Sequence, residues 1–175
     1  MQSGTGSIFQ PGLATGPSLA VELISSHARI GGTINLGAYT RLSDLLNFHD
    51  EILTVTDGKV LNRSGIATAD GAPDLDVRLD GLTIVVDHSD YVPPPDPEAI
   101  EKRSHRLLVV TRGHVITGTF FTYPGAEPVA YLRAAEPHWV PIADVRIRSL
   151  VDRRVKFSAA FAVLNRRSVV ATTIG

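Results

Sequence analysis

Arginine is the residue whose type and spacing suggest chemistry most clearly in this chain. A guanidinium binds carboxylate or phosphate groups through two parallel hydrogen bonds. Seven basic side chains fall within one expected hairpin and its flanks: Arg146, Arg148, Arg153, Arg154, Lys156, Arg166 and Arg167. We take these seven as the candidate binding residues. Carboxylates of a protein surface are the favoured partner, and RNA or DNA phosphates are the alternative.

The charge distribution supports that reading. The net charge is only −1, yet residues 1–100 carry five Lys and Arg against thirteen Asp and Glu, whereas residues 101–175 carry twelve against five. Summed charge of opposite sign attracts surfaces at long range. The split favours contact between an acidic half and a basic half, within one chain or between neighbours, and the acidic half would repel a long polyanion.

The six histidines provide weaker candidates. His27 and His114 take matching positions after a first expected turn, where an imidazole most simply caps backbone groups. The adjacent pairs His49–Asp50 and Asp87–His88 combine acid and imidazole, but neighbours in a strand point to opposite faces. We therefore expect no metal site.

Enzymatic chemistry has little support in the sequence. Ser26, His27 and Asp57 would be the residue types of a nucleophilic triad, but they lack a recognisable motif around them. The run Gly4–Gly6 resembles the start of a dinucleotide loop without the strand and helix that such a loop requires. The chain contains no cysteine, which excludes thiol catalysis and disulfides. We expect no catalytic residue and no cofactor, and a small hydrolase with its site between two repeats is the enzymatic alternative.

Composition indicates a globular chain. With 175 residues, 43% of them hydrophobic, the protein is large enough to bury a core. No apolar run reaches the roughly 18 residues of a membrane span, and the amino terminus lacks the pattern of a signal peptide. We expect a cytoplasmic protein with no membrane partner.

Breakers in the sequence divide the chain into four parts. Residues 1–18 are rich in Gly, Ser, Thr and Pro, which predicts a flexible tail. Four prolines between Pro93 and Pro97 predict a linker over 93–104. The boundaries are therefore a tail at 1–18, a first β-rich repeat at 19–92, the linker at 93–104 and a second β-rich repeat at 105–175.

The two β-rich segments resemble each other, which indicates a tandem duplication. Apolar positions, a Gly-Thr pair and an aspartate recur in the same order. The offset is 87 in the first run, 86 after a one-residue slip in the second, 87 in the third and fourth, and 78 in the last. The matched runs are Val21–His27 with Leu108–His114, Ile30–Ile34 with Ile116–Phe120, Leu42–Leu45 with Val129–Leu132, Ile52–Val60 with Trp139–Ile147, and Thr83–Asp87 with Phe161–Asn165.

Each copy is expected to form four strands with one short helix between the second and third. The glycine of the Gly-Thr pair lies inside the second strand, where it typically marks a bulge or a close backbone approach. Strongly bent strands in a copy of this size suit a small β-barrel or half-barrel. The predicted fold class is therefore mainly β with short inserted helices, built from two such units about a pseudo-twofold axis.

Three runs carry a resemblance to known proteins: His27–Ile34, Arg41–Asn47 and Ile52–Val60. Together they resemble a small uncharacterised bacterial β-rich domain, and they are more distantly similar to Sm-like β-barrels. The second repeat matches less well, with Pro128–Tyr131 in place of Arg41–Asp44. The bacterial domain implies the fold, and the Sm-like similarity implies ring formation or RNA binding.

These observations favour a non-enzymatic binding or assembly module. It is expected to associate with itself or with another protein through surfaces of complementary charge, while apolar strand faces supply affinity. An RNA- or DNA-binding module that uses the arginine cluster is the first alternative, and the small hydrolase is the second.

Overall fold

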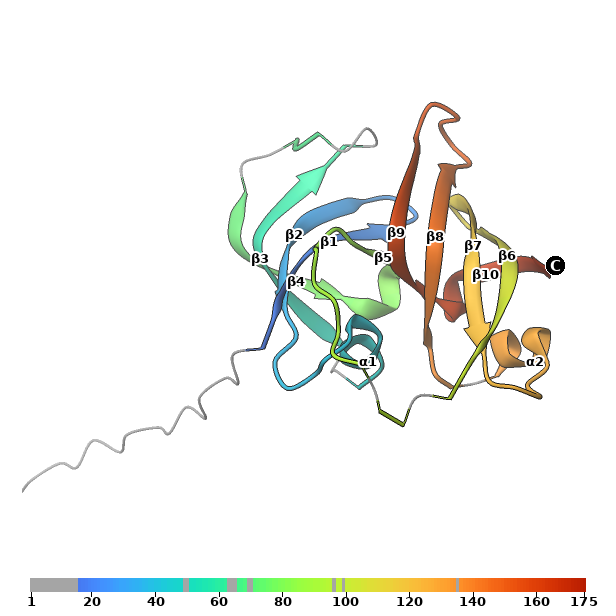
Figure 1. Ribbon diagram of the computed structural model, residues 1–175. Helices are drawn as coiled ribbons and strands as arrows, with labels where there is room; N and C mark the ends of the chain where they lie inside the picture. Colours follow the sequence, from blue (N-terminus) through green and yellow to red (C-terminus); the bar gives the residue numbers. More distant parts are fainter. Residues whose placement is uncertain are drawn as a thin grey trace, which may run out of the picture.

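The chain is mainly β, as the sequence predicts (Figure 1). The computed structural model describes residues 16–48, 51–62, 66–68, 71–95, 97–98, 100–134 and 136–175. Within them, ten antiparallel strands form one sheet with two short α-helices. The elements follow in the order β1 (Ser18–Ser25), β2 (Arg29–Asn35), α1 (Leu42–Phe48), β3 (Ile52–Leu61), β4 (Ala72–Arg78), η1 (Leu79–Gly81), β5 (Leu82–Asp87), β6 (Arg103–Thr111), β7 (His114–Thr122), α2 (Pro128–Arg133), β8 (Trp139–Ser149), β9 (Lys156–Asn165), η2 (Arg166–Ser168) and β10 (Val169–Ile174).

The described strands form an open sheet, so of the two forms expected, barrel or half-barrel, the closed barrel is wrong. Their order is β10-β6-β7-β8-β9-β5-β1-β2-β3-β4. Closing the second half would require β9 to pair with β10, the other outer strand of that half. Instead β9 pairs with β5 of the first half, which leaves β10 and β4 as the two edges.

Each half contains five strands, one more than expected. The sequence did not reveal β4, in which Pro73, Asp74 and Asp76 weaken the strand pattern, nor β10. Residues 161–165, aligned above with 83–87, belong to the fourth strand of their half, whereas β5 is the fifth of its own. These two segments pair with each other, with Asp87 opposite Phe161.

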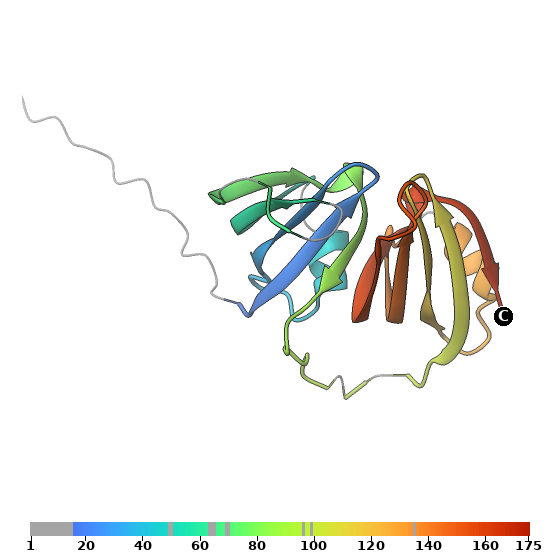
Figure 2. The same cartoon turned by 90° about the horizontal axis from the view of Figure 1, so that it is seen from above.

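The seam between the halves is the ladder of β5 and β9, and both faces of it are buried (Figure 2). On one face, Trp139 and Val163 of the second half join the core cluster of the first half. On the other face, Ile84 and Val86 of the first half join the core of the second. A twofold axis would pair equivalent strands, but the seam pairs a fifth strand with a fourth, so the expected pseudo-twofold symmetry is not confirmed.

A β-bulge occurs at the same place in both halves. Asp57 in β3 and Asp144 in β8 have left-handed φ angles of 52° and 51°, and the registers of β2 with β3 and of β7 with β8 shift beside them. The facing glycines, Gly32 and Gly118, allow the close approach: a Cβ at Gly118 would lie 2.9 Å from the carbonyl oxygen of Ala143. The bulge predicted at the Gly-Thr pair is confirmed, and the extra residue lies in the opposing strand.

The expected tail and linker are only partly covered by the described residues. Residues 1–15 lie outside them, as do 96 and 99 of the linker. Gly16 and Pro17 are already joined to the fold, because the Asn35 side chain donates to the Gly16 carbonyl at 2.9 Å and the Leu36 amide donates to the Pro17 carbonyl at 2.9 Å. The second half begins with β6 at Arg103.

The close backbone approach at the bulge predicts that one added methyl group at Gly118 destabilises the fold. Replacing Gly118 with Ala forces a contact with backbone at Ala143 and should lower the free energy of unfolding by about 1–3 kcal/mol. Gly81→Ala is the matched control, because a Cβ there meets nothing within 4 Å. Urea unfolding of both variants measures the difference, and equal stabilities would contradict the close approach.

Candidate functional site

The two sheet edges are the most distinctive surfaces of the molecule. β10 is one edge, and its six residues carry no charge, with Val170 67% exposed. β4 is the other, and it presents Asp74 and Asp76 to solvent. An edge strand with unpaired backbone groups is a template for another strand, and charges are a usual protection against such pairing. β10 lacks that protection.

The backbone pattern shows which groups of β10 are free. Arg106 of β6 and Gly175 exchange both backbone hydrogen bonds, at 3.1 Å each. Because N–H groups alternate along a strand, those of Ala171 and Thr173 also point toward β6, and those of Thr172 and Ile174 point away from the sheet. The outer side of β10 therefore offers donors in the positions that an added strand would use.

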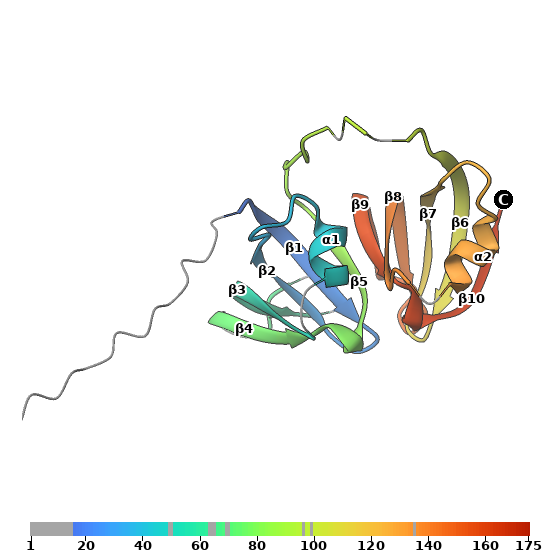
Figure 3. The same cartoon turned by 90° about the horizontal axis from the view of Figure 1, so that it is seen from below.

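The helix α2 lies beside β10 (Figure 3). Residues of β10 and of the chain around α2 line a groove. It has a volume of about 710 Å³ and is lined by residues 169–172 together with Leu132, Arg133, His138, Arg166 and Arg167. None of these lining residues is acidic, so the groove is basic. We call it the β10 groove.

Arg166 is the buried cation of the β10 groove. It is 8% exposed, and its guanidinium donates to the backbone oxygen of Tyr131. Its Nε and Nη2 have no hydrogen-bond partner among the described residues. Burial lowers the pKa of Arg166 from its usual value, while Tyr131 and Glu136 oppose the shift. A guanidinium in this state is stabilised by an additional carboxylate or phosphate.

The neighbouring Arg167 contacts His138, with 2.7 Å between Arg167 Nη2 and His138 Nε2. The same imidazole nitrogen lies 2.9 Å from Glu136 Oε1. An unprotonated Nε2 accepts from Arg167, and a protonated one donates to Glu136, so a single tautomer satisfies only one of these contacts.

The β4 edge is acidic. Asp76 accepts a hydrogen bond from the Thr54 hydroxyl at 2.9 Å, and Asp74 lies two residues away on the same face. Arg78, the basic residue of this edge, already pairs with Asp80 at 3.0 Å and lies 3.8 Å from Glu51. Arg78 also lowers the pKa of Asp80 through their hydrogen bond.

The seven predicted binding residues do not form one cluster. Arg148 faces Lys156 at one end of the β8–β9 ladder, whereas Arg166 and Arg167 follow Asn165, which pairs with Trp139 at the other end. Arg153 and Arg154 lie in the hairpin connection beside the first group. The arginines close together in the sequence are thus separated, because an antiparallel hairpin carries its two ends apart.

Four cations do share one face of the second half. The register pairs Arg146 with Thr117, Arg148 with Lys156 and Arg106 with Thr119. Directly paired residues, and residues two apart in a strand, lie on the same face of a sheet. Arg106, Arg146, Arg148 and Lys156 are exposed there, and we call this set the basic face.

The histidines do not assemble into a catalytic or metal site. His27 is exposed and His114 is buried, and they are not equivalent: the turns close between Ser25 and Ala28 in one half and between Thr111 and His114 in the other. The described residues contain no group of three potential metal ligands. No hydrogen bond or ion pair joins Ser26, His27 and Asp57 in the described structure, and the pair His49–Asp50 lies outside it.

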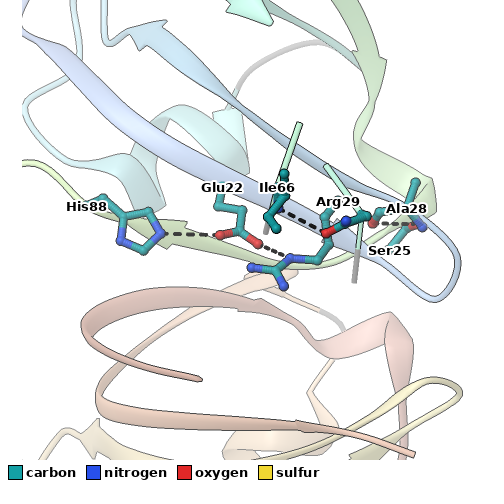
Figure 4. Close-up of polar contacts among 7 residues, drawn as sticks. Glu22, Ser25, Ala28, Arg29, Ile66 and His88 are labelled. Atoms are coloured by element: carbon teal, nitrogen blue, oxygen red, sulfur yellow. Dashed lines mark hydrogen bonds and ion pairs between the residues drawn. The ribbon is translucent and has the colours of Figure 1, made fainter. Parts of the chain in front are cut away.

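A buried ion pair joins β1 and β2, and it was not predicted from the sequence. Glu22 lies between Arg29 and His88, as Figure 4 shows, and its oxygens contact Arg29 Nε and His88 Nε2, the latter at 3.5 Å. Arg29 also lies over the ring of Phe157, 4.6 Å from its centroid. Spacing along the chain gives no signal for this group, because its members come from β1, β2, β9 and the residue that follows β5.

A pocket of about 800 Å³ between the halves is the place where a hydrolase site was considered. Its lining includes Tyr91, Tyr123, Trp139, Arg41 and Lys102, but none of the histidines that the structure describes. An approach of His27 or His114 to an aspartate would favour the hydrolase alternative, but neither histidine lines this pocket.

Comparisons with protein-family models, curated proteins and solved structures find no match to this chain. No described helix has the length and apolar character needed to cross a membrane.

Buried His114 predicts a pH-dependent stability. Its Nδ1 has no hydrogen-bond partner in the described part of the chain, and its pKa is lowered by burial and by the nearby charge of Arg29. As the pH falls below about 6.5, His114 of the unfolded chain binds a proton more readily than His114 of the folded chain. The free energy of unfolding should therefore decrease as the pH is lowered from 7 to 5, by at most about 1.4 kcal/mol per pH unit for one proton.

His114→Gln should reduce this loss, as measured by urea unfolding at both pH values. Exposed His27→Gln is the control and should leave the pH dependence unchanged. An identical pH dependence in the parent and His114→Gln proteins would contradict the assignment.

Proposed function

We propose that this protein is a non-enzymatic assembly module, built by tandem duplication, that associates with further copies of itself through the two edges of its sheet. The shared element order of the halves, the shared order of five strands and the recurring Gly–Asp bulge support a duplication. Each of these features occurs once in each half of the structure, as a duplicated sequence would produce.

The single observation that carries the proposal is the seam. It joins the fifth strand of the first half, β5, to the fourth strand of the second, β9. The fifth strand of the second half, β10, and the fourth strand of the first, β4, are the strands left at the edges. A second copy can therefore add its β4 to β10 by the same kind of antiparallel ladder that already joins the halves.

The contact joins two different surfaces of the chain, so each added copy leaves one free β4 edge and one free β10 edge for the next copies. Such a head-to-tail contact closes into a ring when the rotation between copies permits, and otherwise extends into a filament. Because the β4 edge is acidic and the β10 groove is basic, attraction between unlike edges favours this direction over pairing of like edges. The resemblance to Sm-like proteins agrees with assembly of this kind.

Assembly predicts a size larger than one chain in solution. Size-exclusion chromatography with light scattering should find a discrete multiple of the 18.8 kDa chain, with weaker association as salt is raised. A monomer at every salt concentration and at micromolar protein would contradict the proposal.

Thr172→Pro tests which edge is used. It removes an N–H that points away from β6, and proline is tolerated on the outer side of an edge strand. We expect it to abolish assembly while the chain remains folded by circular dichroism, and the control Thr172→Val, which keeps the N–H, should assemble like the parent.

Nucleic-acid binding is the second candidate, and the basic face is the observation that favours it. Arg106, Arg146, Arg148 and Lys156 could contact successive phosphates, although Asp144 lies near Arg146. Purified protein with a raised 260/280 nm absorbance ratio, returning to that of free protein in Arg146→Gln/Arg148→Gln, would support it. The same double substitution should leave edge assembly unchanged.

A further inference from the structure

The internal seam allows the residues of a contact between two copies to be identified. The left-handed aspartates Asp57 and Asp144 lie 87 positions apart, as do the starts of η1 and η2. The ladders keep the same offset: Ile52 pairs with Arg78, and Trp139 pairs with Asn165. Positions 87 apart in the third, fourth and fifth strands of the halves are therefore equivalent.

Because these positions are equivalent, the register of the seam predicts the register between β10 of one copy and β4 of another. In the seam, Val85 of β5 lies opposite Val163 of β9. Their counterparts are Thr172 of β10 and Asp76 of β4. In the same way, Asp87 lies opposite Phe161 in the seam, so Ile174 is expected to lie opposite Asp74 of the second copy. The free N–H groups of Thr172 and Ile174 point toward the incoming strand in this register.

The seam buries an apolar group where the free edges carry charges. Val163 lies in a core cluster that also contains Leu46 of α1 and Leu79 of η1. The position equivalent to Val163 is Asp76. The position equivalent to Leu79 is Arg166. The helices α1 and α2 begin 86 positions apart, at Leu42 and Pro128, so Leu46 corresponds to Leu132 and Asn47 corresponds to Arg133. Leu132, Arg133 and Arg166 all line the β10 groove.

The replacement occurs on both sides of the contact and with opposite signs. An apolar residue becomes an acid on the β4 side. On the groove side the apolar Leu79 becomes Arg166, and Asn47, which bonds to Trp139 across the seam, becomes Arg133. Either change alone would place an unpaired charge in a contact that the seam keeps apolar, which is costly. The two together form a charge pair, and Arg166 already has two buried nitrogens without partners.

We infer that the occupant of the β10 groove is the β4 edge of a second copy of this chain, with Asp76 directed at Arg133 and Arg166. The inference rests on the proposed function and specifies its interface. The contact between chains contains a charge pair, whereas the seam within the chain is apolar. The acidic β4 therefore binds the basic β10 groove in preference to the apolar surface that receives β9.

A charge exchange tests this pairing. Asp76→Arg and Arg133→Asp, each alone, should weaken self-association by about tenfold or more at low salt. The double variant Asp76→Arg/Arg133→Asp should regain assembly. Arg133 is chosen because it lies at the end of α2, whereas removing buried Arg166 endangers the fold.

Mixing the two single variants gives a stricter test. The arginine at position 76 of one chain meets the aspartate at position 133 of the other, and the remaining contact keeps the parent pair. An equimolar mixture should therefore assemble although neither component does. Asp90→Arg and Lys102→Asp make the same charge changes at exposed residues outside β4, β10 and the β10 groove and serve as controls that should assemble like the parent.

The outcomes separate this inference from the proposed function. Light scattering that finds assembly lost in Thr172→Pro but unchanged in Asp76→Arg and Arg133→Asp would overturn the charge pair and leave edge assembly standing. Failure of both the double variant and the mixture to assemble, with folded chains by circular dichroism, would also overturn it. A monomeric parent would overturn both proposals.

Discussion

The pairing of β5 with β9 is the constraint on which the rest of this structure depends. It buries both faces of the two strands, so that Val85 and Val163 belong to one core cluster and Ile84 and Leu164 to the other. Side-chain contacts reinforce it: the amide of Asn47 in α1 accepts from the Trp139 N–H and donates to the Trp139 carbonyl, both at 2.9 Å. The halves therefore form one continuous sheet.

The same pairing determines what remains exposed. Because one fourth strand and one fifth strand are consumed in the seam, the molecule ends in the other fourth strand and the other fifth strand. These edges differ in charge, because β4 carries Asp74 and Asp76 whereas β10 carries no charged residue. A chain with unlike ends and one sheet direction is suited to head-to-tail addition, and the opposite charges of its two halves acquire a structural role in such an assembly.

Local sequence patterns were sufficient for most elements of the fold. The β-rich runs around Val21 and Leu107, the alternation of Val145 and Ile147 with Arg146 and Arg148, and the strand-interior Gly118 each report a short-range physical preference. The helix at Leu42 follows from apolar spacing over two turns. β4 and β10 were not predicted. β4 is rich in Asp and contains Pro, and β10 is short and weakly periodic, so neither has a distinctive strand pattern.

The sequence by itself determined the mainly β class, the charge division and the residue types available for binding. Only the tertiary structure decided that β5 meets β9, that the sheet stays open, and that Arg166 is buried while Arg153 is exposed. Strand pairing depends on contacts between residues such as Val85 and Val163, which lie far apart in the chain. Neither local propensity nor spacing contains that information, because the ladder is stabilised by surfaces that exist only after both halves have folded.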